Sequence, residues 1–341
     1  MLLGPEHIEV REVPVPRPGP GELLLKVRAA TTCGTDVKVY RRGGHPRMLK
    51  VPTLFGHEMA GTVADIGENV SRFARGDDVV VANSASCGEC NACRSERENL
   101  CQDLLYLNGA FAQYLLVPQR FVERNTHKIP QGLAFEVAAL TEPLACVLHG
   151  IEACELEKYS RIGSPEIIVY GAGPIGLLFV AALARQGHRV ILADPNPPRL
   201  EVGQKLGAED TVCIERGGEQ HARVVAKTRR AKGAQVAVDC TGVPEVWQDA
   251  LASVAAGGLV NLFGGCAPGT TIPLDTHRLH YSELTIKGVY HHRPANVRDA
   301  LAMLSDDKFQ SRLLLTTECG IDGVENALRQ MMEKKALKVV I

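Results

Sequence analysis

The sequence carries almost no net charge and has no long uninterrupted apolar run. Its 38 basic and 39 acidic residues nearly cancel, so no general field attracts nucleic acid or a membrane surface, and a small molecule is the expected partner. The N-terminus lacks a basic start followed by an apolar core, so we expect no signal peptide and a cytoplasmic protein. The most apolar stretch, residues 167–184, contains three glycines and Pro174. That pattern predicts a buried strand, a tight turn and a buried helix rather than a membrane span.

The length of 341 residues exceeds the usual limit of one hydrophobic core, so we expect two domains. Up to about residue 120, short β-type runs alternate with Gly, Pro and Asp, which predicts a β-rich domain. From about residue 138, apolar strands alternate with amphipathic helices, which is typical of βαβ units and a parallel sheet. The predicted fold is an α/β chain plus a β-rich domain. Residues 1–146 and 283–341 form the β-rich domain, and residues 147–282 form an inserted doubly wound domain.

The chain has eleven cysteines. In a reducing compartment these are not expected to form disulfides, so a cluster of them indicates metal or redox chemistry. Four lie in a polar lobe of about residues 84–103, with the spacing C-x2-C-x2-C-x7-C. Short CxxC steps aim successive sulfurs at one point, which predicts a closed tetrahedral zinc site that cannot bind substrate. An iron–sulfur cluster is the competing interpretation, because it also uses four thiolates. The predicted ligands are Cys87, Cys90, Cys93 and Cys101.

A glycine-rich turn opens the α/β half of the chain. It reads GAGPIG at residues 171–176, directly after an apolar strand and before a helix. In such a turn Gly171 allows the bend, Gly173 admits a pyrophosphate, and Gly176 lets helix and strand pack closely. The next strand ends at Asp194, which would bind the adenosine ribose and repel the 2′-phosphate of NADP, so NAD is the predicted cofactor. Arg199 weakens the preference for NAD, because a nearby arginine can neutralise the charge of a 2′-phosphate. The alternative interpretation is a structural turn that binds no ligand. The predicted cofactor site comprises Gly171, Gly173, Pro174, Ile175, Gly176, Asp194 and Arg199.

A second set of metal-binding residues is scattered through the sequence. Taken singly, Cys33, His57 and Glu142 have structural explanations: a buried thiol, a core histidine and a charge at a helix N-terminus. Together with Glu58 they supply a thiolate, an imidazole and carboxylates. That ligand mix suits a catalytic zinc that keeps one position open for water or substrate.

These motifs, in this order, resemble the zinc-containing medium-chain dehydrogenases/reductases over essentially the whole chain. The combination of GHE at 56–58 with EPL at 142–144 is most similar to the sorbitol (polyol) and threonine dehydrogenase branch. The resemblance implies a GroES-like catalytic domain with an inserted Rossmann domain, one catalytic and one structural zinc ion, and a homodimer or homotetramer. It also implies that Cys33, His57 and a carboxylate bind the catalytic zinc, with Glu58 and Glu142 exchanging between direct ligation and holding a metal-bound water.

The same resemblance assigns two roles near Cys33. Asp36 matches the residue that orients the zinc-binding imidazole, and Thr35 matches the hydroxyl that receives the alcohol proton. Zinc lowers the pKa of a bound hydroxyl, so an alcohol can pass a hydride to the nicotinamide near neutral pH. Lys38 stands where many relatives have a histidine. It is interpreted as a solvated lysine, a proton relay or an anchor for negative charge.

Polar residues also predict the kind of substrate. A polyhydroxylated or acid-bearing secondary alcohol would be bound by Tyr40, His45, His291 and His292. The alternative is that these residues belong to solvated loops. A threonine-like oxidation of a 3-hydroxy amino acid is a second possible activity. A non-catalytic NAD- and zinc-binding relic is a third interpretation, which the intact ligand set argues against.

Overall fold

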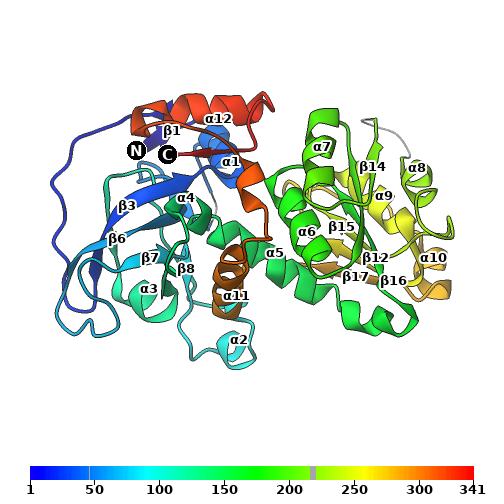
Figure 1. Cartoon of the computed structure of the whole chain (residues 1–341), viewed down its shortest axis with the longest axis horizontal. Coiled ribbons are helices and arrows are strands. Elements are labelled where there is room, and N and C mark those ends of the chain that lie inside the picture. Colours follow the sequence, from blue (N-terminus) through cyan, green and yellow to red (C-terminus); the bar gives the residue numbers. More distant parts are fainter. Residues whose placement is uncertain (46, 216–219) are drawn as a thin grey trace. The chain divides into compact units, whose positions relative to one another are not determined.

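The computed structural model describes residues 1–45, 47–215 and 220–341 (Figure 1). The chain divides into two compact units, each made of separate segments. The first unit contains Met1–Ala145, His292–Asp307 and Leu314–Ile341, and the second contains Cys146–His291 and Lys308–Leu313. The first unit is rich in antiparallel strands and the second contains a parallel sheet. The fold class predicted from the sequence is therefore confirmed.

A seven-stranded sheet is the framework of the first unit. Its strands follow the order β11, β7, β6, β3, β19 and β18, with β10 also paired to β3. Alternate residues of β3 and β6, such as Leu23, Leu25 and Met59, point into one hydrophobic core, as the period of two in a strand requires. The strands of this unit are β1 (Leu2–Gly4), β2 (His7–Ile8), β3 (Leu23–Thr31), β4 (Gly44–His45), β5 (Leu49–Lys50), β6 (Glu58–Ile66), β7 (Asp78–Val81), β8 (Ser84–Ala85), β9 (Leu105–Tyr106), β10 (Tyr114–Val117), β11 (Thr126–Lys128), β18 (Leu315–Glu318) and β19 (Lys338–Val340).

Short helices fill the connections of the first unit. Helix α1 follows β3 directly, and α12 packs on it through a second apolar cluster. Helix α5 begins in this unit and continues into the second. The helices are α1 (Gly34–Arg42), α2 (Asn91–Arg94), η1 (Glu98–Leu100), α3 (Gln119–Arg124), α4 (Phe135–Ala138), α5 (Thr141–Ala153), α11 (Pro294–Leu304), η4 (Ile321–Gly323) and α12 (Val324–Met332). All of η3 (Ser311–Leu314) except Leu314 belongs to the second unit.

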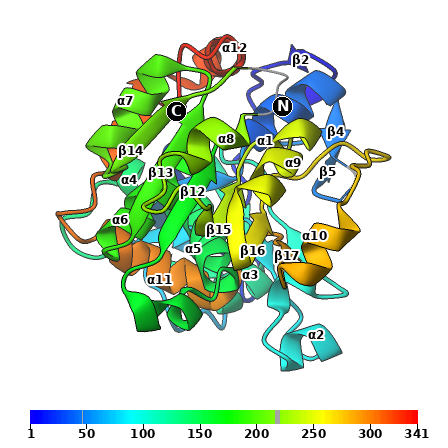
Figure 2. The same ribbon diagram turned by 90° about the vertical axis from the view of Figure 1, so that its right-hand side faces the viewer.

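The second unit is built on a six-stranded parallel sheet. Figure 2 shows its strands side by side in the order β14, β13, β12, β15, β16 and β17. The order reverses between β12 and β15, where the chain begins to wind in the opposite direction. The elements are η2 (Leu156–Ile162), β12 (Glu166–Tyr170), α6 (Pro174–Arg185), β13 (Arg189–Asp194), α7 (Pro197–Lys205), β14 (Asp210–Cys213), α8 (His221–Val225), β15 (Ala234–Asp239), α9 (Pro244–Ser253), β16 (Val254–Leu262), α10 (Thr276–Tyr281) and β17 (Thr285–Gly288).

The most apolar stretch, residues 167–184, forms most of β12, the glycine turn and most of α6, as predicted. Every residue of β12 is buried, which explains its continuous apolar run, because a parallel strand is covered on both faces. No helix in the described part of the chain is long and apolar enough to cross a membrane.

The point of return to the first unit differs from the prediction. We placed it at residue 283, on the assumption that the strand near residue 285 belonged to the β-rich domain. Instead β17 pairs in parallel with β16 over Thr285–Gly288. These residues therefore extend the parallel sheet, and the chain leaves the second unit only after His291.

Candidate active site and metal centres

Three of the predicted catalytic zinc ligands come together in the first unit. Ligand atoms of Cys33, His57 and Glu58 all lie within 4.8 Å of one another. Antiparallel pairing of β3 with β6 sets Thr31 opposite Glu58. Because Cys33 follows β3 directly and His57 precedes β6, the register of this pair brings the thiol and the imidazole to the same end of the sheet.

Asp36 ties the thiol segment to the imidazole. Its Oδ2 accepts a hydrogen bond of 2.8 Å from the backbone N–H of Cys33, and its Oδ1 lies 3.0 Å from Nδ1 of His57. With Nδ1 used in this way, Nε2 of His57 is left for a metal ion. Burial lowers the pKa of His57, but Asp36 and Cys33 raise it more, so the net pKa lies well above its usual value.

Sequence reasoning missed Lys338, which balances the charge of Glu58. Both side chains are buried, with 1% and 0% of the residue exposed. Lys338 donates to Oε2 of Glu58 and, at 2.8 Å, to the backbone carbonyl of Thr32, while Thr31 also donates to Oε2. Burial lowers the pKa of Lys338, but the charges of Glu58 and Cys33 raise it by more, so the net pKa lies above its usual value. The available signal was a lysine within the apolar run ALKVVI at the end of the chain.

The second carboxylate oxygen of Glu58 supports the metal interpretation. Oε1 is buried and has no hydrogen-bond partner among the described residues. Buried polar atoms almost always have a partner, so an orphaned oxygen beside a thiol and an imidazole is unusual. One thiolate, one imidazole nitrogen and one carboxylate oxygen fit a zinc ion with an open fourth position.

Glu142 lies in the first turn of α5 and is also buried. Burial raises the pKa of Glu142 most, the attraction of His57 lowers it, and the repulsion of Glu58 raises it again, so that the net pKa is about 7. His292, a predicted substrate-binding residue, is only 1% exposed. Its Nε2 lies 3.1 Å from Oδ1 of Asn83 and 3.9 Å from Oε1 of Glu142. His292 therefore lies beside a candidate zinc ligand rather than on an open surface.

The remaining predicted residues of helix α1 face in different directions. Thr35 is partly buried, and its backbone N–H lies 3.4 Å from Sγ of Cys33. Lys38 is exposed. Tyr40 does not lie with the zinc ligands. It is 1% exposed in the cluster between α1 and α12, and its hydroxyl donates to Glu325 at 2.8 Å. The periodicity of the amphipathic helix α1 turns this ring, which we predict to bind substrate, into the core.

The two other predicted substrate residues have local roles in the structure. Nδ1 of His45 accepts hydrogen bonds from the backbone N–H groups of Arg47 and Met48, at 3.1 and 3.0 Å, and so closes its own turn. His291 has a positive φ of 61°, and its carbonyl accepts a hydrogen bond of 2.7 Å from Nδ1 of His149.

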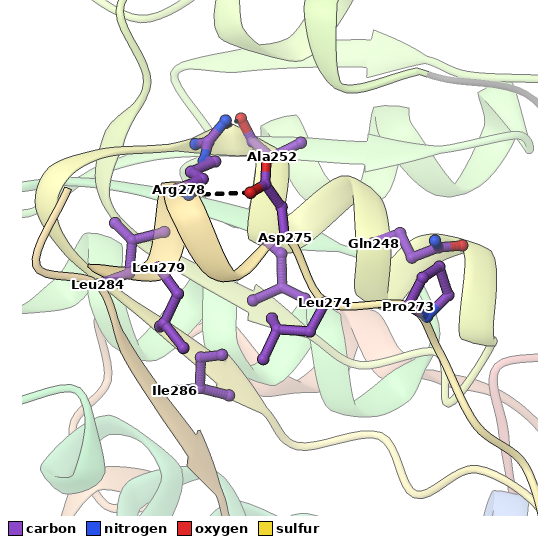
Figure 3. Close-up of a pocket in the computed structure, with 10 residues that line it drawn as sticks. Gln248, Ala252, Pro273, Leu274, Asp275, Arg278, Leu279, Leu284 and Ile286 are labelled. Carbon is purple, nitrogen blue, oxygen red and sulfur yellow. Dashed lines mark hydrogen bonds between the residues drawn. The ribbon is translucent and has the colours of Figure 1, made fainter. Parts of the chain in front are cut away.

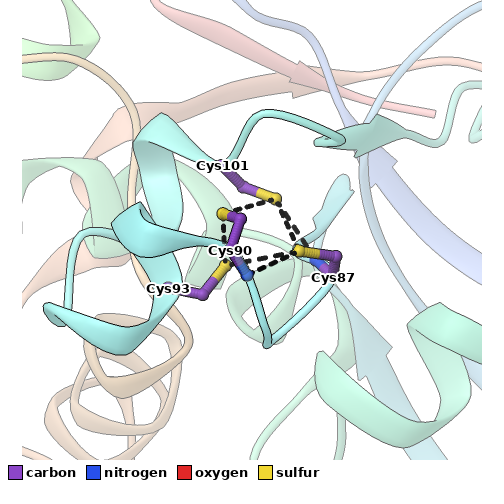
Figure 4. Close-up of side chains that lie close together, drawn as sticks. All are labelled: Cys87, Cys90, Cys93 and Cys101. Atoms are coloured by element: carbon purple, nitrogen blue, oxygen red, sulfur yellow. Dashed lines mark hydrogen bonds between the residues drawn. The ribbon is translucent and has the colours of Figure 1, made fainter.

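The four clustered cysteines surround one point (Figure 4). Four of their Sγ–Sγ distances lie between 3.5 and 3.9 Å. A tetrahedron with Zn–S bonds of about 2.3 Å has edges of about 3.8 Å. The geometry therefore fits a single ion held by four thiolates. In an iron–sulfur cluster the thiolates bind separate irons around a larger core, and these short separations leave no room for one.

Backbone groups prepare the cysteine lobe for a cation. The N–H groups of Cys87 and Cys90 lie 3.3 and 3.4 Å from the sulfurs of Cys101 and Cys87. Such contacts stabilise thiolates, and backbone N–H groups are the largest influence lowering the pKa of Cys87 and of Cys90. Arg124 donates to the carbonyl of Cys87 and fastens the lobe to α3.

The glycine turn of the second unit has the geometry of a phosphate-binding turn. Gly171 has a φ of 100° and begins the bend after β12. A Cβ on Gly176 would lie 1.8 Å from the carbonyl oxygen of Gly171, so only glycine fits there. Helix α6 then starts with Gly173 as its N-cap and Pro174 and Ile175 in the first turn. The N-cap offers no side chain, which leaves the backbone N–H groups for an anion.

Asp194, the last residue of β13, fixes the glycine turn that follows the neighbouring strand β12. Its Oδ2 accepts a hydrogen bond of 2.7 Å from Ala172, and its Oδ1 accepts one of 2.8 Å from Asn196. Arg199 lies in the first turn of α7, where burial lowers its pKa and Asp194 raises it. The two charges that favour NAD and NADP respectively are therefore both at this edge of the sheet.

Comparisons with known proteins agree with this geometry. The family described as "Alcohol dehydrogenase GroES-like domain" matches residues 19–131, and "Zinc-binding dehydrogenase" matches residues 174–306. The chain is 33% identical to a sorbitol dehydrogenase of Bacillus subtilis, over 98% of this chain and 94% of the relative. It is 30% identical to an L-threonine 3-dehydrogenase of Aeromonas hydrophila, over 98% and 95%. A zinc-binding dehydrogenase structure from Sinorhizobium meliloti bound to NADP superposes with a TM-score of 0.88 at 28% identity, over 99% and 97%.

The buried pair of Lys338 and Glu58 predicts a large effect on stability. Lys338→Met should lower the free energy of unfolding by about 3 kcal/mol, because it leaves a buried carboxylate without its counter-charge. Urea unfolding followed by circular dichroism measures this, with Trp247 fluorescence reporting on the second unit alone. Lys335→Met, which removes an exposed pair with Glu333, is the control and should change little. Adding Glu58→Gln to Lys338→Met should recover most of the loss. Equal losses of unfolding free energy in Lys338→Met and Lys335→Met would contradict the charge balance between Lys338 and Glu58.

Proposed function

Since the chain belongs to the zinc-containing medium-chain dehydrogenase family, we propose that it oxidises a secondary alcohol of polyol, sugar or cyclitol type with NAD as hydride acceptor. The observation that carries the proposal is the convergence of Cys33, His57 and Glu58, with a buried and unpaired carboxylate oxygen, at one point of the first unit. A closed four-cysteine site elsewhere would serve only as a structural element.

The residues of the first unit have separate tasks in this proposal. When bound, zinc would supply the polarisation of the alcohol hydroxyl and a nicotinamide would supply the hydride acceptor. Cys33 and His57 hold the ion, and Asp36 keeps the imidazole in the tautomer that presents Nε2. The hydroxyl of Thr35 receives the alcohol proton at the N-terminus of α1. Glu58 or Glu142 supplies the carboxylate, and Lys338 prevents the buried acids from accumulating charge.

The substrate class rests on likeness and on polar side chains. A relative 33% identical is a sorbitol dehydrogenase, which supports a polyhydroxylated alcohol. Of the predicted substrate residues we retain His45 and His291, and we assign His292 to holding Glu142. Lys38 is an exposed candidate for relaying the proton to solvent. The second candidate, oxidation of a 3-hydroxy amino acid, is supported by the 30% identical L-threonine 3-dehydrogenase.

An activity panel combined with zinc analysis tests the proposal. Zinc-loaded protein should reduce NAD with sorbitol, xylitol or inositols faster than with L-threonine. The group of Cys33, His57 and Glu58 and the four-cysteine group should each hold one ion. Cys33→Ser should lose the catalytic ion and lower kcat/KM about a thousandfold or more, because zinc supplies several kcal/mol of stabilisation. Cys213→Ser, which changes an exposed thiol outside both clusters, should alter neither quantity. Faster turnover of L-threonine would favour the second candidate, and zinc in the cysteine lobe alone would favour a non-catalytic relic.

The preference for NAD over NADP is proposed from Asp194. Its charge would repel a 2′-phosphate, whereas Arg199 would attract one. Asp194→Asn removes the charge with little change in shape, so kcat/KM for NADP relative to NAD should rise at least about tenfold, equivalent to about 1.4 kcal/mol. Arg199→Ala should lower the same ratio. A wild-type enzyme that uses NADP better than NAD would contradict the assignment.

We further propose a homodimer formed through the edge of the parallel sheet. Among the described residues no strand pairs with the outer edge of β17, and open edges invite pairing with a second copy. Beside it lies a cavity of about 230 Å³ (Figure 3), lined mainly by apolar side chains from α9, α10 and β17. Leu274 at this cavity is 44% exposed. Pairing two β17 strands about a two-fold axis would join the sheets and cover these side chains.

A charge at the cavity should weaken such a dimer. Leu274→Asp would place a carboxylate in an apolar contact, so the dimer dissociation constant should rise at least about tenfold. Analytical ultracentrifugation measures this change. Val13→Asp, at a still more exposed apolar position in the first unit, is the control and should leave assembly unchanged. A monomeric wild-type protein, or a Leu274→Asp dimer as tight as the wild type, would overturn the proposed interface.

A further inference from the structure

Asp239, at the carboxyl end of β15, has an unusual number of hydrogen bonds for one buried side chain. The residue is 0% exposed. Its Oδ1 accepts hydrogen bonds from the backbone N–H and the hydroxyl of Thr241, at 3.1 and 2.6 Å. Its Oδ2 accepts from the N–H of Gly242 at 2.9 Å and from Nε1 of Trp247 at 3.0 Å. Burial raises the pKa of Asp239, and these donors partly offset that shift.

The carboxylate joins two loops that follow neighbouring strands. One loop, residues 240–243, follows β15, and the other, residues 263–265, follows β16. The indole N–H of Trp247 is shared between Asp239 and the carbonyl of Gly264, which is 3.0 Å away. The main chains touch as well, since a Cβ on Gly242 would lie 2.4 Å from the carbonyl oxygen of Gly265.

The first of these loops also contacts the glycine turn. A Cβ on Gly171 would lie 2.8 Å from Cγ2 of Thr241, and the N–H of Cys240 donates to the carbonyl of Tyr170 at 2.9 Å. The strand order reverses between β12 and β15. In open parallel sheets, ligands bind outside the carboxyl ends of the strands at such a reversal. The loop held by Asp239 and the glycine turn therefore lie on either side of the place where the strand order reverses.

We propose that Asp239 is a positioning residue for the coenzyme. Through Thr241, Gly242 and Trp247 it fixes the loops after β15 and β16 against the glycine turn, so that this rim is already formed when the dinucleotide binds. The inference rests on the proposed binding of NAD. Without the carboxylate, four half-buried donors lose their acceptor and the rim has to be ordered by the ligand, which weakens binding.

The test compares two buried aspartates of the same unit. Asp239→Ala should raise the Kd for NADH, measured by isothermal titration calorimetry, at least about tenfold, as expected for lost hydrogen bonds to a charged group. Asp249→Ala is the matched control. Asp249 is also buried and accepts hydrogen bonds from the N–H groups of Gln220 and His221, at 3.1 and 3.2 Å, but it holds the start of α8. Its variant should lose stability and leave the Kd for NADH unchanged.

Two milder variants keep the inference testable should Asp239→Ala fail to fold. Asp239→Asn retains one acceptor oxygen and should give an intermediate Kd. Trp247→Phe removes the shared N–H together with part of the ring, and should raise the Kd about threefold, with faster hydrogen exchange in residues 240–243 and 263–265. Equal changes in Kd for Asp239→Ala and Asp249→Ala, or unchanged Kd values in both milder variants, would overturn the positioning role. A wild-type protein that does not bind NADH would instead overturn the proposed function.

Discussion

The pairing of β3 with β6 is the constraint on which the candidate active site depends. It sets Thr31 opposite Glu58 and brings Cys33 and His57 to the same end of the sheet. When the pairing of two strands slips by one residue, every side chain of the slipped strand moves to the opposite face of the sheet. The hydrophobic core beneath these strands therefore helps to fix the metal site as well, because a one-residue slip that moved the ligands apart would also turn core side chains such as Leu25 or Met59 outward.

Charge balance is the second requirement at this site. Asp36, Glu58 and Glu142 are all buried, and such a group of acids would repel one another strongly without compensation. Lys338 reaches Glu58 from β19, at the far end of the sequence. Burial is the largest cause of the raised pKa of Glu142, and the repulsion of Glu58 and Asp36 adds to it. A divalent cation would add a further positive charge beside these acids, which connects the stability of the fold to binding at this site.

Much of this arrangement was predictable, and the omissions have a common cause. Alternating patterns and glycine spacing identified both kinds of sheet, and short CxxC steps identified the cysteine lobe, because in these cases the spacing alone determines the geometry. The edge strand β17 was assigned to the wrong unit because a short apolar strand carries no sign of its partner. The burial of Tyr40 was not foreseen, because helical periodicity and not the polarity of its hydroxyl decides which way its ring points. Lys338 and Asn83 were missed because their partners lie far away in the sequence.

A buried carboxylate lies at the candidate catalytic zinc site, at the glycine turn and at the coenzyme rim, and in each case it accepts a hydrogen bond from a backbone N–H group. Asp36 accepts the N–H of Cys33 while holding His57, Asp194 accepts the N–H of Ala172 beside the glycine turn, and Asp239 accepts N–H groups of the loop after β15. Each acid fixes a backbone segment that follows or precedes a strand, through side-chain oxygens that accept backbone N–H groups. Asp36 and Asp194 could be recognised from the sequence because they stand in known motifs, whereas Asp239, which joins the loops after β15 and β16, emerges only when the strands are placed side by side.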